Sequence, residues 1–209
     1  MSQHAGAHGR LAKFRAWIAR AAADRRGVAA VEFALVAPLL LCMYFVTMEV
    51  SQAVETNKKV SRIASMVSDL VAQQSATTPA ELDAIMKIGQ SLLTPYYRSK
   101  PTITITAIEI TNLPSSKVKV FWSRKLDNDV AGPNPLLPNG TITTVPATLN
   151  VPGTFLVRVD SELEYKPVVI WAASSKPTLG LTAAFDKLSM KERYYLRPRM
   201  SPQIDCPDC

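Results

Sequence analysis

Histidine is nearly missing from this sequence, and its two copies lie where they exclude most imidazole chemistry. His4 and His8 both fall within the first ten of the 209 residues. The rest of the chain therefore has no imidazole for a Ser–His–Asp triad or for the usual zinc sites. A glycine-rich phosphate loop and a cluster of metal ligands are missing too. We expect a non-catalytic protein with no metal and no cofactor.

Charged residues are scarce in Val28–Val50, where the only two are Glu32 and Glu49, one near each end. At about 1.5 Å per helical residue this stretch reaches about 34 Å, which is enough to cross a hydrocarbon core of about 30 Å. It is longer than the apolar core of a signal peptide, about 7–15 residues, and Thr47–Val50 makes a poor cleavage site. We therefore predict a retained transmembrane helix over residues 28–50.

Acidic residues are rare in the first 27 positions, which hold Asp24 alone against a series of arginines and a lysine. This segment carries most of the net charge of +7. Lysine and arginine beside a first span stay in the cytoplasm. We therefore predict a basic cytoplasmic leader over 1–27, a single pass, and a domain exported to the far side. The charges further along are mixed and form no basic cluster with interleaved aromatic residues, so we expect no nucleic-acid partner.

Glycine and proline are missing between Val50 and Gln74, so the helix is expected to continue beyond the span. Pro38 is expected to kink it inside the membrane. The sequence predicts an amphipathic extension over 51–74. Its apolar residues recur at spacings of three and four, which is typical of one buried helical face: Val60, Ile63, Ala64, Val67, Leu70 and Val71.

The region after Gln74 predicts an α+β domain over residues 75–209. Thr78–Glu81 is a capping box with proline at the first helical position, and it opens a helix expected to run to about Leu93. Alternation with a period of two then predicts an antiparallel sheet of about four strands over 102–110, 117–124, 155–165 and 191–196. Residues 127–153 are rich in Asn, Pro and Gly and are predicted to form one long loop. Two stretches stay ambiguous, Val168–Trp171 and Leu179–Phe185.

Cysteine occurs three times. Cys42 lies inside the predicted span and is expected to be an apolar filler. Cys206 and Cys209 lie near the C-terminus, where an oxidising compartment would permit a disulfide. A bridge within the chain and a link between chains both stay open. The carboxylates of Glu162 and Glu164 are expected to share a solvated strand face rather than to form an active site.

One motif stands at the boundary between leader and span. The basic pair Arg25–Arg26 precedes Gly27, an apolar run begins at Val28, and Glu32 follows with Phe33 behind it. This resembles the processing site of type IV prepilins, in the Glu–aromatic form of Flp-type pilins. The resemblance implies that a prepilin peptidase cuts between Gly27 and Val28, which would make Glu32 the fifth residue of the mature chain.

The residue types suit that chemistry. Gly27 has no side chain, so an extended backbone can enter a narrow protease cleft. A carboxylate such as Glu32 at the edge of the hydrocarbon is costly unless it has a partner. The resemblance implies that this partner is the N-terminal amine of a neighbouring subunit.

More narrowly, residues 25–50 resemble the opening of TadE-like proteins, the minor pseudopilins of tight-adherence pilus systems. The likeness continues more weakly to Gln74. It implies a pilin-like fold and a place in the bacterial inner membrane, with the C-terminal domain in the periplasm. It implies as partners the membrane, a prepilin peptidase, other pilins or pseudopilins, and the inner-membrane assembly platform.

The length of the chain narrows the role within that system. Major Flp pilins are little more than the helix, so the long region after Gln74 favours a minor component, and incorporation into a pilus stays open. Two alternatives remain. One is an unprocessed, membrane-anchored Tad-type envelope scaffold, and the other is an anchored periplasmic enzyme.

Overall fold

The computed structural model describes residues 27–112, 116–167 and 188–209. The chain divides into two compact units, Met1–Met48 and Glu49–Cys209. Three regions with sequence-based expectations lie outside the described residues. They are the leader over 1–26 and the ambiguous stretches Val168–Trp171 and Leu179–Phe185.

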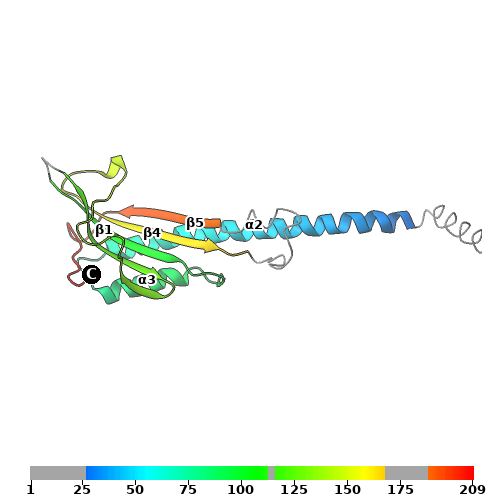
Figure 1. Ribbon diagram of the computed structural model, residues 1–209, viewed down its shortest axis with the longest axis horizontal. Helices are drawn as coiled ribbons and strands as arrows, with labels where there is room; N and C mark the ends of the chain where they lie inside the picture. Colours follow the sequence, from blue (N-terminus) through cyan, green and yellow to red (C-terminus); the bar gives the residue numbers. More distant parts are fainter. Residues whose placement is uncertain (1–26, 113–115, 168–187) are drawn as a thin grey trace, which may run out of the picture. The chain divides into compact units, whose positions relative to one another are not determined.

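The longest element is helix α2, Val28–Ala72, which is labelled in Figure 1. The single continuous helix predicted from the sequence is confirmed, and it ends two residues before Gln74. The predicted buried face is confirmed as well. Five of its six residues are buried and Leu70 is half-buried, because the sheet and the second helix pack against this face of the second unit.

Helix α3, Pro79–Ser91, begins at the predicted capping box. The backbone N–H of Glu81 donates to the Thr78 hydroxyl at 3.3 Å, and the backbone N–H of Thr78 donates to the Glu81 carboxylate at 2.9 Å. The two bonds satisfy donors that the first turn of a helix leaves without partners. The helix ends at Ser91, two residues earlier than expected, and Leu93 is still buried in the core.

The sheet has five antiparallel strands in the order β3-β2-β1-β4-β5. Four of them correspond to the predicted strands. Their bounds are β1 Thr102–Ile110, β2 Val118–Asp127, β3 Val130–Pro133, β4 Phe155–Tyr165 and β5 Leu188–Leu196.

The prediction of one long loop over 127–153 is wrong, because this range contains a fifth strand. Strand β3 lies inside that range and pairs with β2, and a short 3-10 helix, Ala147–Leu149, follows. Asn128 and Asp129 both have positive φ, 47° and 67°, which is the backbone that a two-residue hairpin turn requires. Because β3 itself contains Gly132 and Pro133, its composition is that of a loop.

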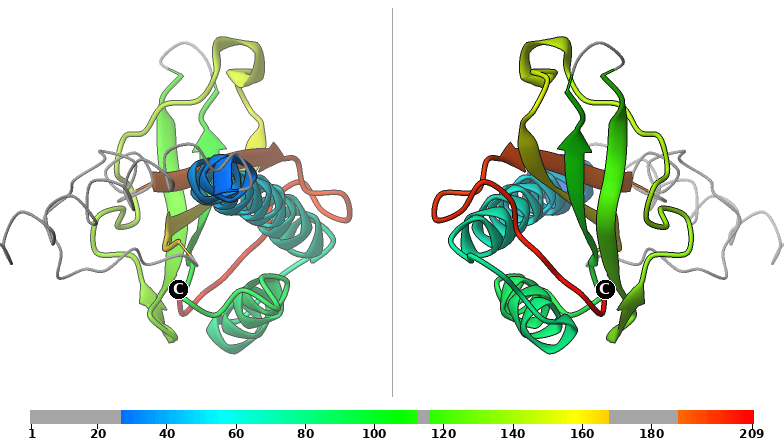
Figure 2. Two further views of the ribbon diagram at one scale, coloured as in Figure 1. Left: turned by 90° about the vertical axis from the view of Figure 1, so that its right-hand side faces the viewer. Right: turned by 90° about the vertical axis from the view of Figure 1, so that its left-hand side faces the viewer.

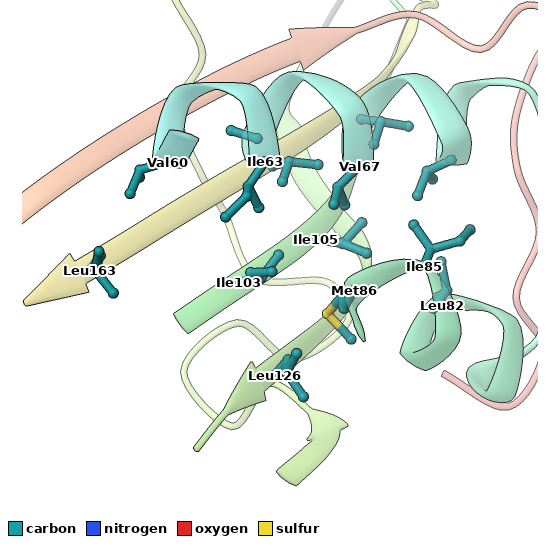
Figure 3. Packing of buried hydrophobic residues seen from close by; sticks show 14 of the residues in the cluster. Val60, Ile63, Val67, Leu82, Ile85, Met86, Ile103, Ile105, Leu126 and Leu163 are labelled. Carbon is teal, nitrogen blue, oxygen red and sulfur yellow. The ribbon is translucent and has the colours of Figure 1, made fainter. Parts of the chain in front are cut away.

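The part of α2 that belongs to the second unit covers one face of the sheet together with α3 (Figure 2). The core lies between these layers. Figure 3 shows Val60, Ile63 and Val67 of α2 and Met86 of α3 facing the strands. The buried strand residues labelled in the same view are Ile103, Ile105, Leu126 and Leu163.

Gly89 allows α3 to approach α2 closely. A Cβ built at Gly89 would lie 2.6 Å from Cγ2 of Val67 and 3.3 Å from Cγ2 of Ile63. Real Cβ atoms do not approach other carbons as closely as the first of these distances. The glycine is therefore part of the packing between the two helices.

Candidate functional site

The residues of the prepilin-like motif lie at the start of α2. Gly27 directly precedes Val28, the first residue of α2, and the side chains of Val28, Glu32 and Phe33 are all exposed. Val28 and Glu32 are four positions apart, which puts them on one face of the helix, one turn from each other. A Cβ built at Gly27 would meet nothing within 4 Å. Nothing in the described fold therefore requires glycine at this position.

Apolar side chains surround Glu32 on every side of the helix. Val31, Phe33, Leu35 and Val36 are exposed, and none of the most apolar 18-residue window of α2 is buried. By length and composition this helix could cross a membrane. A helix that is apolar all round needs lipid or protein around it, because water would leave a large hydrophobic surface uncovered. Within residues 27–112, 116–167 and 188–209, no hydrogen bond or ion pair of the Glu32 carboxylate occurs.

Glu49, the second acid of the apolar run, has an environment that the sequence did not reveal. Its side chain is 4% exposed, and the phenol of Tyr165 donates to its carboxylate at 2.5 Å. Tyr165 is the last residue of β4, so this bond ties the end of β4 to α2. No local pattern predicts it, because the two residues lie 116 positions apart.

Arg98 lies beside this pair, in the loop that follows α3. Its guanidinium donates to the carbonyl of Lys166 at 2.6 Å and to the side chain of Gln52 at 3.3 Å. The guanidinium carbon lies 4.5 Å from the ring centre of Tyr96, within the range of a cation–π contact. The rings of Tyr96 and Tyr165 are stacked at 5.7 Å. The loop after α3 and the end of β4 are thus held together against α2.

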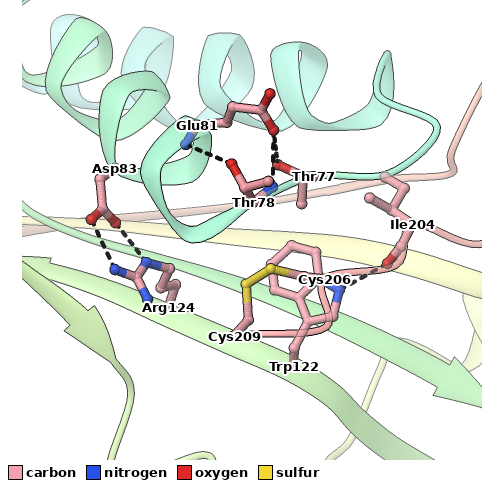
Figure 4. Close-up of a disulfide and its surroundings, with 9 residues drawn as sticks. All are labelled: Thr77, Thr78, Glu81, Asp83, Trp122, Arg124, Ile204, Cys206 and Cys209. Atoms are coloured by element: carbon pink, nitrogen blue, oxygen red, sulfur yellow. Dashed lines mark hydrogen bonds and ion pairs between the residues drawn. A yellow bond between two sulfur atoms is a disulfide. The ribbon is translucent and has the colours of Figure 1, made fainter.

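Cys206 and Cys209 are joined by a disulfide in the structure (Figure 4). The C-terminal segment that carries them crosses from the end of α2 to the sheet. The backbone N–H of Arg199 donates to the carbonyl of Ala72 at 2.9 Å, and the Trp122 indole N–H donates to the carbonyl of Ile204 at 2.8 Å. Ile204 is fully buried, so the segment before the disulfide belongs to the core of the second unit.

The other candidate residues of the sequence lie where a structural role suffices. Glu162 and Glu164 are exposed on β4, and Glu162 pairs with Lys191 at 2.6 Å. Among the aromatic side chains of the sheet, Trp122 is buried and Phe121 packs against Phe155. The motif at Gly27 and the cysteine pair belong to different units.

Residues 27–68 match the family model of TadE-like proteins. No curated protein matches the chain, and neither does any solved structure. The matched range begins at Gly27 and ends within the buried half of α2, so it covers the apolar helix and leaves out the sheet. The similarity of the chain to TadE-like proteins therefore lies in this helix.

Proposed function

We propose that this chain is a minor pseudopilin that takes part in assembly of a tight-adherence pilus. A prepilin peptidase cuts it after Gly27, and the mature chain begins at Val28. The apolar part of α2 holds the protein in the inner membrane, and the sheet domain lies in the periplasm. The protein acts through contacts with other pilins or pseudopilins and with the assembly platform, without catalysis.

The observation that carries this proposal is that the family match begins at Gly27, the residue after which the prepilin resemblance implies the cut. Helix α2 continues from Val28. The open space around Gly27 adds support. The described residues leave room for a side chain at Gly27, so their packing does not require glycine there, whereas the narrow cleft of a protease would.

The exposed carboxylate of Glu32 supports the assembly role. A charge surrounded by Val31, Phe33 and Leu35 is costly once the helix enters lipid or a helical bundle. A partner of opposite charge relieves that cost. In the proposed mature chain the new amine of Val28 would lie one turn away on the same helix, and the corresponding amine of a neighbouring subunit could pair with Glu32.

The Glu32→Ala variant tests this role, expressed in a strain that lacks the native gene. The variant should enter the membrane, because removing the charge eases insertion by about a kcal/mol or more. It should also be cleaved, since the peptidase acts at Gly27. It should not restore surface pili, because the amine of the neighbouring subunit then has no counter-charge.

A matched control is Glu55→Ala, which removes an exposed carboxylate from the same helix beyond the predicted span. This variant should restore pili fully. Normal piliation by Glu32→Ala would contradict the assembly role. If surface pili form only when the chain keeps residues 1–27, that result would instead favour the membrane-anchored scaffold.

A further inference from the structure

The loop after α3 and the end of β4 meet α2 where its apolar run ends. We define the proximal collar as Tyr96–Arg98, from the loop after α3, together with Tyr165 and Lys166 at the end of β4. Tyr165 bonds to Glu49, and Arg98 bonds to Gln52. The backbone N–H of Lys166 donates to the Tyr96 hydroxyl at 2.8 Å. The collar is therefore a connected structure fixed to one turn of the helix.

That turn contains the predicted end of the membrane span. The span predicted from the sequence ends at Val50, between the two α2 residues that hold the collar. Membrane anchoring is part of the proposed function, and a role for the collar at the membrane rests on it. If α2 leaves the bilayer near Val50, the collar lies at the level of the lipid headgroups.

The exposed side chains of the proximal collar are of types that suit the level of the lipid headgroups. Tyr97 is 77% exposed, and the Lys166 side chain is exposed as well. Tyrosine is enriched where a protein crosses from hydrocarbon to water, since its ring is apolar and its hydroxyl is polar. In the part of the chain that the structure describes, the Lys166 ammonium has no ion pair. Because the Lys166 side chain is exposed, its ammonium can reach a phosphate.

The balance of charge favours an anionic surface. Arg98 and Lys166 are both cationic, and the carboxylate that contacts the collar, Glu49, is buried and accepts the Tyr165 hydroxyl. The exposed Glu55 is paired with Lys59 at 3.0 Å. Glu164 precedes Tyr165 on β4 and therefore points to the opposite face of the sheet.

We propose that the proximal collar is a membrane-contact surface that binds the headgroups of anionic lipids. Tyr97 inserts among the headgroups, and Lys166 binds lipid phosphate, while Arg98 holds the loop in place. Basic side chains at an anionic bilayer surface are attracted to it over roughly a Debye length. The contact would hold the sheet domain against the membrane from which its own helix emerges.

The test places a fluorescent thiol label at position 97 of the full chain. Cys42→Ala combined with Tyr97→Cys leaves one free thiol, since Cys206 and Cys209 are bonded to each other. The protein is reconstituted into vesicles of phosphatidylcholine, with or without phosphatidylglycerol, that contain a lipid with a nitroxide quencher on its headgroup. A matched site is Val151→Cys in the same background. Val151 lies near Gly153, whose N–H bonds to Ile110 at the far end of β1, about 30 Å from the collar.

Quenching at position 97 should be several-fold stronger than at position 151, and it should increase with phosphatidylglycerol. Lys166→Glu should abolish that increase. Lys117→Glu makes the same charge change at an exposed position near the far end of β1 and should leave the increase intact. Equal quenching at 97 and 151 would overturn the proposal, and quenching at 97 that ignores phosphatidylglycerol would overturn its anionic preference.

Labelling the native Cys42 in a separate sample distinguishes a collar that does not contact lipid from a helix that does not anchor the protein in the membrane. A quencher in the acyl chains should quench Cys42 strongly if α2 spans the bilayer. If Cys42 is quenched and position 97 is not, the anchor stands and the collar does not contact lipid. If Cys42 is not quenched either, membrane anchoring itself fails.

Discussion

The Tyr165 hydroxyl donates a 2.5 Å hydrogen bond to the carboxylate of Glu49, which joins the last residue of β4 to the first residue of the second unit. Both side chains are buried. Burial, and then the hydrogen bond to Glu49, raise the pKa of the Tyr165 phenol above its ordinary value. The phenol is therefore a fixed donor to the buried carboxylate at neutral pH.

Tyr165→Phe should lower the free energy of unfolding by about 1–3 kcal/mol, because it removes a donor from a buried carboxylate. Thermal or urea unfolding of the full chain in detergent measures the loss. Tyr97→Phe removes a hydroxyl from an exposed ring nearby and should change stability little. Equal stability of the two variants would show that Glu49 does not need the phenol.

The raised pKa of Tyr165 also gives this pair a pH dependence of known sign. The native state holds the phenolic proton more tightly than the unfolded state. The resulting stabilisation is complete below the ordinary pKa of 10.0 and is lost as the pH rises above it. The unfolding free energy of the native chain should therefore fall more steeply above pH 10 than that of Tyr165→Phe. Parallel curves would contradict the assignment.

Gly89→Ala should destabilise the second unit by about 1–3 kcal/mol. Alanine is the better helix former by about 1 kcal/mol, but its Cβ would overlap Val67 in the packed core. Gly132→Ala in β3 is the control, because a Cβ there meets nothing within 4 Å. Unfolding midpoints of the two variants provide the comparison. A stabilised Gly89→Ala would mean that the helices can move apart without cost.

Local patterns were sufficient to predict much of this fold. The capping box at Thr78–Glu81 places the start of α3, since its two hydrogen bonds involve residues only three positions apart. The alternation in 102–110 and 155–165 gives the bounds of β1 and β4, because one face of each strand is in the core. The motif from Gly27 to Phe33 is also local, so the family resemblance was accessible from the sequence alone.

The features that were missed depend on distant residues. The partner of Glu49 is a tyrosine at the end of β4, and the partner of the Trp122 indole is the carbonyl of Ile204. Neither pairing produces a periodic pattern in the amino-acid sequence. Strand β3 was missed for a different reason. It is an edge strand of four residues with Gly and Pro, which are the residues that typically mark a loop.

The disulfide should form within one chain in exported protein. A thiol reagent applied to unreduced protein under denaturing conditions should label Cys42 alone, and reduction should add Cys206 and Cys209. For so short a loop the bridge should contribute about 2 kcal/mol at most. Labelling of all three cysteines before reduction would contradict the bridge. A dimer that reduction separates would mean that the bond links two chains.

The direction of the membrane crossing follows from the basic leader. A reporter that is active only in the periplasm, fused after Cys209, should be active in growing cells, because the arginines of the leader stay in the cytoplasm. A second fusion with a reporter that is active only in the cytoplasm serves as the control and should be silent. Activity of the second reporter would reverse the topology and remove the basis for a pseudopilin.

The identity of the first residue of the mature chain, determined by mass spectrometry, tests the central claim most directly. Protein purified from cells with an active prepilin peptidase should begin at Val28, and Gly27→Val should keep the leader, since a branched side chain would crowd the protease cleft. Glu55→Ala, which changes the same helix away from the cut, should be processed normally. Mass spectrometry that finds the native chain still beginning at Met1 or Ser2 in those cells would contradict processing and favour a membrane-anchored scaffold.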